Sequence, residues 1–289
     1  MSGANAVQRI VRLPDVQSQA DDRALRLDAA GVKGVRYPVT VRSRTRLVPT
    51  IASFSMAVGL PAVAKGTHMS RFLELLEAQT QPLDQRGFKT LLLDMLAKLE
   101  ARTGAIEMRF IYFVRKAAPV SRVESQLDHE VRWRGCVTED GQYTFHMHVA
   151  VPATSLCPCS KEISAYGAHN QRSLISIEVE VLGELQIDEL IAVAERNASC
   201  EVYGLLKRPD EKHVTERAYE NPKFVEDLVR DVALELNQEA RIGAYIIEAE
   251  NFESIHNHSA FARLIRPPPP DGAARRSGAA ADFPGSTIE

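Results

Sequence analysis

The pattern of apolar residues follows the same order twice along this chain, and this repetition constrains the fold more than any other feature. Strands are predicted where apolar side chains recur at every second position, and helices where they recur every three or four positions. The first pass is strand-strand-helix-helix-strand-strand, at residues 33–43, 48–60, 69–79, 84–102, 107–116 and 127–138. The second pass has the same order, with helices around Leu190 and Leu228 and strands at 143–149, 175–181, 242–250 and 258–264.

Each pass has the size of an ordinary domain, so the chain is expected to be an α+β protein of two tandem units. In each unit, antiparallel hairpins flank a helix pair that covers one face of the sheet. We expect an N-terminal arm at 1–30, the first unit at 31–140 and the second unit at 141–266. Four prolines open the stretch 267–289, which is otherwise rich in Gly, Ala, Arg and Ser and is predicted to be a disordered tail.

Composition argues against several classes of function. The 289 residues include 35 Lys and Arg against 38 Asp and Glu, and a net charge of -3 argues against nucleic-acid binding that ignores base sequence. No apolar run approaches the ~18 residues of a membrane helix, and the N-terminus has no basic stretch followed by an apolar core. Two of the four cysteines are separated by one residue and two are isolated, which is typical of reduced, cytoplasmic thiols.

The segment from Cys157 to Arg172 contains the most distinctive chemistry. Cys157 and Cys159 flank Pro158, and His169 follows in a polar turn before an expected strand. Thiolate and imidazole are ligands that borderline-soft divalent metals prefer, and a thiolate is also a strong nucleophile. The cysteines could instead be small buried apolar residues, or a redox pair with one intervening residue rather than the usual two. The residues alone leave these alternatives open.

Other residues could complete a metal site. Glu211 opens a helix or turn, where it is either a ligand or an acid that complements the helix dipole. His256 and His258 alternate and face the same side, which is a common arrangement for two metal ligands. His146 and His148 have the same spacing on another strand, so spacing alone does not choose between the two pairs.

Glu226 is a candidate for binding the substrate. It lies near the start of a helix for which Asn221 is the expected N-cap, with Pro222 in the first helical position. A carboxylate there either pairs with Arg230 in solvent or accepts two N–H hydrogen bonds from the edge of a purine or pterin. Most helical glutamates are solvated, so the residue alone favours the ion pair.

The basic segment 65–71, Lys-Gly-Thr-His-Met-Ser-Arg, leads into an expected helix. Free backbone N–H groups together with Lys and Arg side chains form a reasonable cradle for phosphates. The glycine spacing of a Walker loop is absent. The alternative is that Thr67 or Ser70 only caps the helix, and the two interpretations carry equal weight.

Together these motifs resemble the type IB GTP cyclohydrolase I family. The resemblance spans almost the whole chain, and its most specific parts are CPCSKEIS at 157–164 and GAHNQRS at 167–173. It implies the tunnelling fold, with two tandem units per chain, and a homotetramer with active sites at subunit interfaces. An enzyme of this family would convert GTP and water to 7,8-dihydroneopterin triphosphate and formate, the first step of folate biosynthesis.

The resemblance also implies roles for single residues. A divalent metal, which could be zinc, manganese or ferrous iron, would be held by Cys157, His169, Glu211 and His256. The implied catalytic residues are Cys157, Glu226, which anchors the guanine edge, and His258, which transfers protons. Contacts to the triphosphate are implied for Lys65, Thr67, His68, Ser70, Arg71, Lys161 and Arg172. Neither a nicotinamide nor a flavin is expected.

Three other functions compete with this one. A tunnelling-fold nitrile reductase would use a cysteine nucleophile and NADPH, but it needs no metal and leaves the histidines and glutamates unexplained. A non-catalytic metal-binding or redox module would account for Cys157 and Cys159, but not for Glu226 or the basic segment 65–71. A relative from methanopterin synthesis would act on the same substrate and release a cyclic phosphate product.

Overall fold

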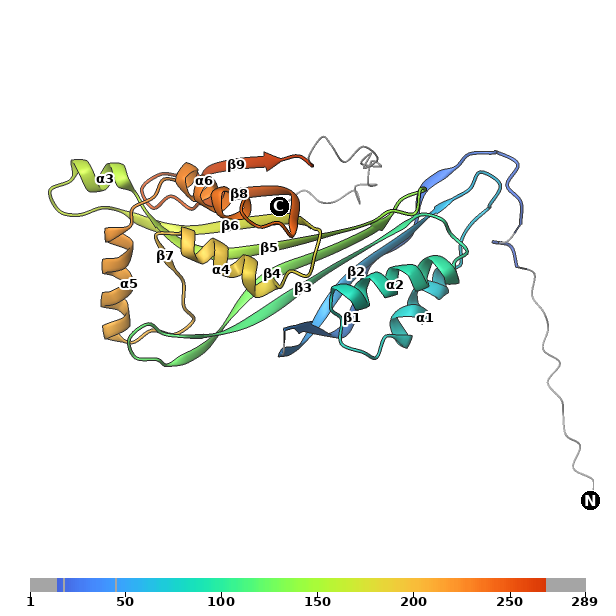
Figure 1. Ribbon diagram of the computed structural model, residues 1–289, viewed down its shortest axis with the longest axis horizontal. Coiled ribbons are helices and arrows are strands. Elements are labelled where there is room, and N and C mark those ends of the chain that lie inside the picture. The colour runs from blue at the N-terminus through green and yellow to red at the C-terminus, as the bar shows by residue number, and fades with distance from the viewer. Residues whose placement is uncertain (1–14, 18, 45, 269–289) are drawn as a thin grey trace, which may run out of the picture.

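The computed structural model describes residues 15–17, 19–44 and 46–268 (Figure 1). Nearly all of the tail predicted at 267–289, and about half of the arm predicted at 1–30, lie outside these residues. Within them, nine strands form one antiparallel sheet whose order is β1-β2-β3-β4-β5-β6-β8-β9, with β7 paired to β5 beside this path. The expected α+β architecture with an antiparallel sheet is therefore confirmed.

The strands follow the alternating stretches of the sequence and extend most of them by several residues. Their bounds are Leu27–Ser43 for β1, Arg46–Leu60 for β2, Gly104–Ala117 for β3, Glu124–Val137 for β4, Tyr143–Leu156 for β5, Asn170–Val181 for β6, Cys200–Glu201 for β7, Ile242–Asn251 for β8 and Ala260–Arg266 for β9. Four of the helices match the two expected pairs: α1 Met69–Ala78, α2 Gln85–Lys98, α4 Ile187–Asn197 and α6 Val225–Leu236. The repeated pattern did not include α3 Pro158–Ile163, α5 Arg208–Glu220 or β7, although a helix or turn was expected at Glu211, which lies in the first turn of α5.

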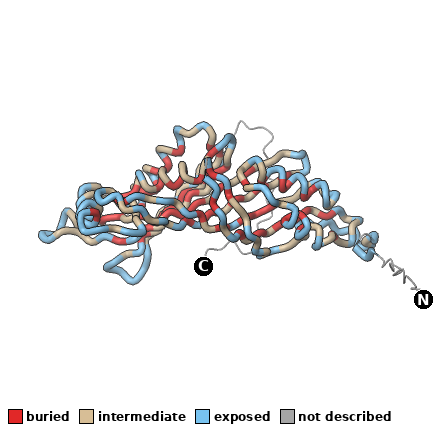
Figure 2. The backbone as a smooth tube through the Cα atoms, turned by 90° about the horizontal axis from the view of Figure 1, so that it is seen from below, coloured by how far each residue is buried: buried red, intermediate tan, exposed pale blue. Residues whose placement is uncertain are grey.

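One face of the sheet is covered by helices and forms a single core. Helices α1 and α2 pack against β1, β3 and β4, while α4 and α6 pack against β5, β6, β8 and β9. Trp133 of β4 is 2% exposed and makes edge-on ring contacts with Phe88 of α2 and with its strand neighbours Phe110 and Phe145. Figure 2 shows the buried backbone running through the middle of an elongated molecule. The division at residue 140 remains an interpretation, because the sheet and core continue through it.

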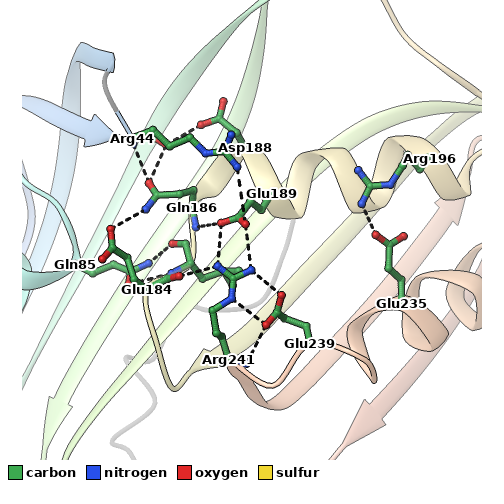
Figure 3. A network of polar contacts seen from close by, with 12 residues as sticks. Arg44, Gln85, Glu184, Gln186, Asp188, Glu189, Arg196, Glu235, Glu239 and Arg241 are labelled. Carbon is green, nitrogen blue, oxygen red and sulfur yellow. Dashed lines mark hydrogen bonds and ion pairs between the residues drawn. The ribbon is translucent and has the colours of Figure 1, made fainter.

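A polar network at the β6–α4 turn also connects the two halves (Figure 3). Asp188 of α4 accepts hydrogen bonds from Ser43 Oγ at 2.7 Å and from Tyr112 Oη at 2.9 Å, both from the first half. On the other side of the turn, Arg241 Nη2 lies 3.1 Å from Glu189 Oε1. The first turn of α4 is thus fixed from both halves of the chain.

One local prediction is wrong. Asn221 does not cap α6, and Pro222 is not its first residue, because α6 begins at Val225 with Phe224 as its N-cap. Asn221 is instead the C-cap of α5, and its side-chain Nδ2 donates to Ala198 O at 2.9 Å. The asparagine side chain is used in a contact between distant segments, which the local capping pattern does not reveal.

The close pairing of β1 and β2 depends on a glycine. A Cβ atom at Gly31 would lie 1.9 Å from the carbonyl oxygen of Met56, so Gly31→Ala must push the two strands apart. We expect this substitution to lower the free energy of unfolding by about 1–3 kcal/mol, as overpacking does. Gly87→Ala in α2 is the matched control, since its nearest contact would be an ordinary 3.5 Å and alanine favours a helix by up to about 1 kcal/mol. Urea denaturation of both variants measures the effect, and equal stabilities would contradict it.

Candidate functional site

The end of β5 and the start of β6, which adjoin the distinctive cysteine and histidine, lie beside α3 at one end of the sheet (Figure 1). Cys157 directly follows β5, and His169 directly precedes β6. Because β5 and β6 are antiparallel, the end of one strand lies beside the start of the other. The backbone N–H of Cys157 accordingly donates to the carbonyl oxygen of His169 at 3.1 Å. The structure thus brings these two predicted ligands together.

A short turn holds both residues in place. Cys157 is the N-cap of α3, and its Sγ accepts a hydrogen bond from the Ser160 backbone N–H at 3.4 Å. The hydroxyl of Ser160 donates to the carbonyl oxygen of Cys157 at 3.1 Å and accepts from the His169 N–H at 3.2 Å. Cys157 is half-buried while Cys159 is exposed, so the two thiols have different environments. Neither is a fully buried apolar residue.

The loop between β8 and β9 lies next to His169. Ser254 Oγ is 3.4 Å from His169 Nδ1, and the nearer partner of that nitrogen is Gln171 Oε1 at 3.0 Å. The same loop carries His256 and His258, whose ring centroids are 5.2 Å apart. Both of these histidines are exposed. Three predicted ligands and the predicted proton-transfer residue therefore belong to segments that meet at this end.

The competing pair, His146 and His148, lies elsewhere. It occupies the first half of β5, and about nine strand residues, roughly 30 Å, separate His148 from Cys157. Burial lowers the pKa of His148 to about 4, with a further contribution from the Arg132 guanidinium, and burial also lowers the pKa of His146. This pair is therefore remote from the turn that carries Cys157 and His169.

Glu211 does not lie beside Cys157 and His169 within one chain. It is in the first turn of α5, where the adjacent Asp210 accepts a hydrogen bond from the Val120 N–H of the β3–β4 turn at 2.8 Å. The other end of α5 meets α3, because Lys161 Nζ donates to the carbonyl oxygen of Tyr219. At 1.5 Å per residue, Glu211 and Tyr219 are about 12 Å apart along the helix axis. Among the described residues, no three His, Cys, Asp or Glu side chains gather into a group able to hold a metal.

The basic segment 65–71 leads into α1, at the opposite end of the molecule from α3 (Figure 1). His68 is the N-cap of α1 without a side-chain capping bond, so the alternative in which Thr67 or Ser70 caps this helix does not hold. Thr67 is buried, and His68 Nε2 lies 3.3 Å from a carboxylate oxygen of Asp15. Arg71 Nη1 donates to the carbonyl oxygen of Lys98 at 3.1 Å, and Lys65 Nζ donates to Gln19 Oε1 at 3.0 Å.

The other predicted phosphate contacts lie near Cys157. Lys161 is in α3, with its Nζ 4.3 Å from the centroid of the Tyr219 ring. Arg172 is exposed in β6, and its carbonyl oxygen accepts from the Phe252 N–H at 2.9 Å. The seven predicted triphosphate residues therefore form two groups, one at each end of the chain's long axis, and one chain does not bring them together.

Glu226 belongs to the end that carries Cys157. The linker before α6 is attached there, because the Lys223 N–H donates to the carbonyl oxygen of Leu156 at 3.0 Å. Glu226 is exposed in the first turn of α6. The solvated pair with Arg230 does not form, since Arg230 Nη1 lies 3.8 Å from Asp227 Oδ1 instead. The Glu226 carboxylate therefore lies at the end of the molecule that carries Cys157. It does not form the ion pair with Arg230 that was the alternative to guanine binding.

Sequence reasoning missed four buried polar residues that lie behind His169. They lie in β5, β6 and β8 and are Ser155, Gln171, Ser173 and Asn251. Each continues the core-facing side of its strand, where the alternation places residues such as Ile175 and Ile247. The signal is visible in the sequence as polar residues at positions where the two-residue period predicts apolar ones.

Two clefts lie away from these residues. One of about 700 Å³ lies between α2 and the β6–α4 turn, and one of about 780 Å³ lies on the face of the sheet without helices. The first is lined by residues such as Lys89 and Glu184, and the second by Arg109, Arg132 and Glu178 among others. The predicted site residues line neither cleft.

Comparison with known proteins gives the family. A model of the family described as type I GTP cyclohydrolase folE2 matches residues 13–262. A GTP cyclohydrolase FolE2 from Cupriavidus necator is 58% identical over 254 residues, which are 88% of this chain and 95% of that protein. A GTP cyclohydrolase FolE2 from Azoarcus sp. is 54% identical over 255 residues, with the same shares covered.

The fold has a relative among solved structures as well. The crystal structure of a hyper-thermostable AgUricase mutant matches with a TM-score of 0.50 and 10% identity, over 87% of this chain and 95% of that one. At this identity the match concerns the fold alone, and it confirms the expected tunnelling fold. Within the described residues, no helix is both long and apolar enough to cross a membrane. On the matched family model and the identity of these relatives, the chain belongs to the type I GTP cyclohydrolase FolE2 family.

Proposed function

We propose that this chain converts GTP and water to 7,8-dihydroneopterin triphosphate and formate, at a site built around Cys157 and His169. Family membership supports the reaction, which opens folate biosynthesis. The observation that most supports this location of the site is the hydrogen-bonded turn that places Cys157 beside His169, where β5 ends and β6 begins. A cytoplasmic location fits the four free cysteines.

The donor set fits a catalytic divalent ion. Thiolate, imidazole and carboxylate groups together suit zinc, manganese or ferrous iron, and a mixed set is typical of catalytic rather than structural sites. Cys157, His169, Glu211 and His256 would hold the ion. When bound, it supplies the Lewis acidity needed for hydration at guanine C8.

The remaining chemistry belongs to side chains of the protein. Glu226 accepts two N–H hydrogen bonds from the guanine edge and so fixes the base in one orientation. His258 gives and takes protons at the ring nitrogens as the imidazole ring opens and formate leaves, a role that suits an exposed imidazole. Lys161 and Arg172 hold phosphate oxygens, and the segment 65–71 supplies further positive charge.

The placement of these groups supports an active site shared between subunits of a homotetramer. Glu211 is about 12 Å along α5 from the contact with α3, and the segment 65–71 lies at the opposite end of the chain (Figure 1). A second protomer is needed to bring Glu211 and the basic segment to Cys157. An interfacial site also agrees with the position of the two clefts, which these residues do not line.

The test is GTP turnover by the purified full chain, stripped of metal and then supplied with Mn²⁺, Zn²⁺ or Fe²⁺. Pterin fluorescence after oxidation and dephosphorylation reports the product. We expect no neopterin from the stripped protein and restored formation with at least one of the three ions. Absence of product with every ion, while the folded protein still binds one, would refute the proposal.

A further inference from the structure

His169 is the first member of a hydrogen-bonded chain that runs into the protein interior. Its Nδ1 lies 3.0 Å from Gln171 Oε1, and Gln171 Nε2 lies 3.0 Å from Ser155 Oγ. Ser155 Oγ is 2.8 Å from Ser173 Oγ, which is 2.7 Å from Asn251 Oδ1. The chain crosses three strands, because Ser155 pairs with Gln171 between β5 and β6, and Ser173 pairs with Asn251 between β6 and β8.

The four side chains behind His169 are almost completely buried. Their exposed fractions are 0% for Ser155, 1% for Ser173, 3% for Asn251 and 7% for Gln171. A buried polar group left unsatisfied costs about 1–3 kcal/mol, and a satisfied pair gains little over apolar side chains of the same shape. Core stability therefore gives no reason for four consecutive polar partners. A series of hydrogen bonds that fixes the protonation site of the His169 imidazole, at its outer end, does explain them.

The two amide groups set the direction in which the protons point. Asn251 presents its oxygen to Ser173, so the Ser173 hydroxyl donates to Asn251 and accepts from Ser155. Gln171 presents its NH₂ group to Ser155, whose own proton is already directed at Ser173. Each hydroxyl thus donates once and accepts once. Gln171 Oε1 is left facing His169, and an acceptor at that position requires the imidazole proton to be on Nδ1.

We propose that Gln171, Ser155, Ser173 and Asn251 are positioning residues that hold His169 as the Nδ1–H tautomer. The proposal rests on the proposed function, in which His169 is a metal ligand. With the proton on Nδ1, the ring keeps the Nε2 lone pair that a divalent ion requires. The alternative partner Ser254 is exposed and lies farther from Nδ1, at 3.4 Å.

The first experiment reads the tautomer directly. Two-bond ¹H–¹⁵N correlation spectra of the metal-free full chain, labelled with ¹⁵N-histidine, distinguish Nδ1–H from Nε2–H, and a His169→Asn spectrum assigns the signal. We expect Nδ1–H in the unmodified protein and loss of that preference in Gln171→Leu. Ser43→Ala is the matched control, since Ser43 is also buried and hydrogen-bonded, at 2.7 Å to Asp188, but lies outside this chain of residues.

Substitutions of Asn251, at the buried end of the hydrogen-bonded series, test the direction in which its hydroxyl groups donate. Asn251→Asp presents only acceptor oxygens when ionised at mildly alkaline pH, so Ser173 can still donate and His169 keeps its Nδ1–H tautomer. Asn251→Leu removes the terminal acceptor and weakens the preference. If the protons pointed the other way, Asn251 would be a donor to Ser173, and the aspartate would disrupt the tautomer as much as leucine does. That result would overturn the proposal, and these two variants serve equally if Gln171→Leu fails to fold.

A second readout is the affinity for Zn²⁺, measured by competition with a chromophoric chelator. Loss of the partner of a liganding histidine costs about 10–100-fold in metal affinity, so we expect Gln171→Leu to bind Zn²⁺ that much more weakly and Ser43→Ala to bind it normally. A folded Gln171→Leu with an unchanged tautomer and affinity would refute the proposal. The spectra need neither metal nor GTP, so failure of the positioning proposal and failure of the cyclohydrolase proposal are separable.

Discussion

Replacement of Cys157 by alanine is expected to reduce neopterin formation at least about 100-fold, to the level of the metal-stripped protein. Loss of a partner behind a metal ligand already costs up to about 100-fold, and loss of the ligand itself should cost no less. Cys157 is the half-buried thiol of the pair, held beside His169 by Ser160. Its removal leaves the site without the thiolate donor.

Cys159→Ala is the matched control for this prediction. Cys159 is exposed in α3, two residues further on, and the substitution likewise removes one thiol sulfur. We expect it to retain most of the turnover and the metal content, measured by the pterin assay and by elemental analysis of the dialysed protein. If the two variants lost activity and metal equally, the assignment of Cys157 as the one thiolate ligand would be wrong.

Substitution of Glu226 by glutamine is expected to reduce kcat/KM for GTP at least about 100-fold while leaving metal content unchanged. Hydrogen bonds to a charged group contribute about 1.5–3 kcal/mol each, and an amide replaces one acceptor by a donor that faces the guanine N–H. A factor of 100 in kcat/KM corresponds to about 2.8 kcal/mol. Loss of one hydrogen bond, together with repulsion between the new amide N–H and the guanine N–H, accounts for this amount. The exposed position of Glu226 at the start of α6 argues against a folding defect as the cause.

The control here is Glu216→Gln, another exposed helical glutamate, whose ion pair with Lys212 is the ordinary i,i+4 kind. Such a pair contributes only about 0.3–0.5 kcal/mol, so stability and kinetics should barely change. Steady-state kinetics with GTP and thermal melting of both variants separate the two roles. A normal kcat/KM in Glu226→Gln would remove this residue from guanine recognition.

The fold was largely predictable because its signal is local. Alternation of apolar residues marks every long strand, and helical spacing marks both helix pairs, so the element order and the antiparallel architecture followed from periodicity alone. Helices α3 and α5 escaped that reasoning for a physical reason. Helix α5 buries only Asp210 and Ala218 and has no continuous apolar stripe, and α3 has only 6 residues, none of them buried.

The site was predictable only in part. Cys157 and His169 follow and precede paired strands, so an antiparallel hairpin brings them together whatever the rest of the fold does. The position of Glu211 depends on how α5 crosses the end of the sheet, and the segment 65–71 lies at the opposite end of the chain from Cys157. The spacing of residues along the sequence predicts neither position. The buried position of Gln171 in β6 was missed because its segment, GAHNQRS, was considered only as a family motif.

The strand order has a consequence for how the chain is made. In the path β1-β2-β3-β4-β5-β6-β8-β9, each strand is hydrogen-bonded to the one synthesised just before it, apart from the two-residue β7 beside the path. Most additions close a short connection, and the two longer ones contain helices α1 and α2 or α4, α5 and α6, so the entropic cost of most additions stays small. Strands β1 to β4 and their two helices can pair before Tyr143 leaves the ribosome. Growth of the sheet can therefore keep pace with translation, and Cys157 meets His169 as soon as β6 is added.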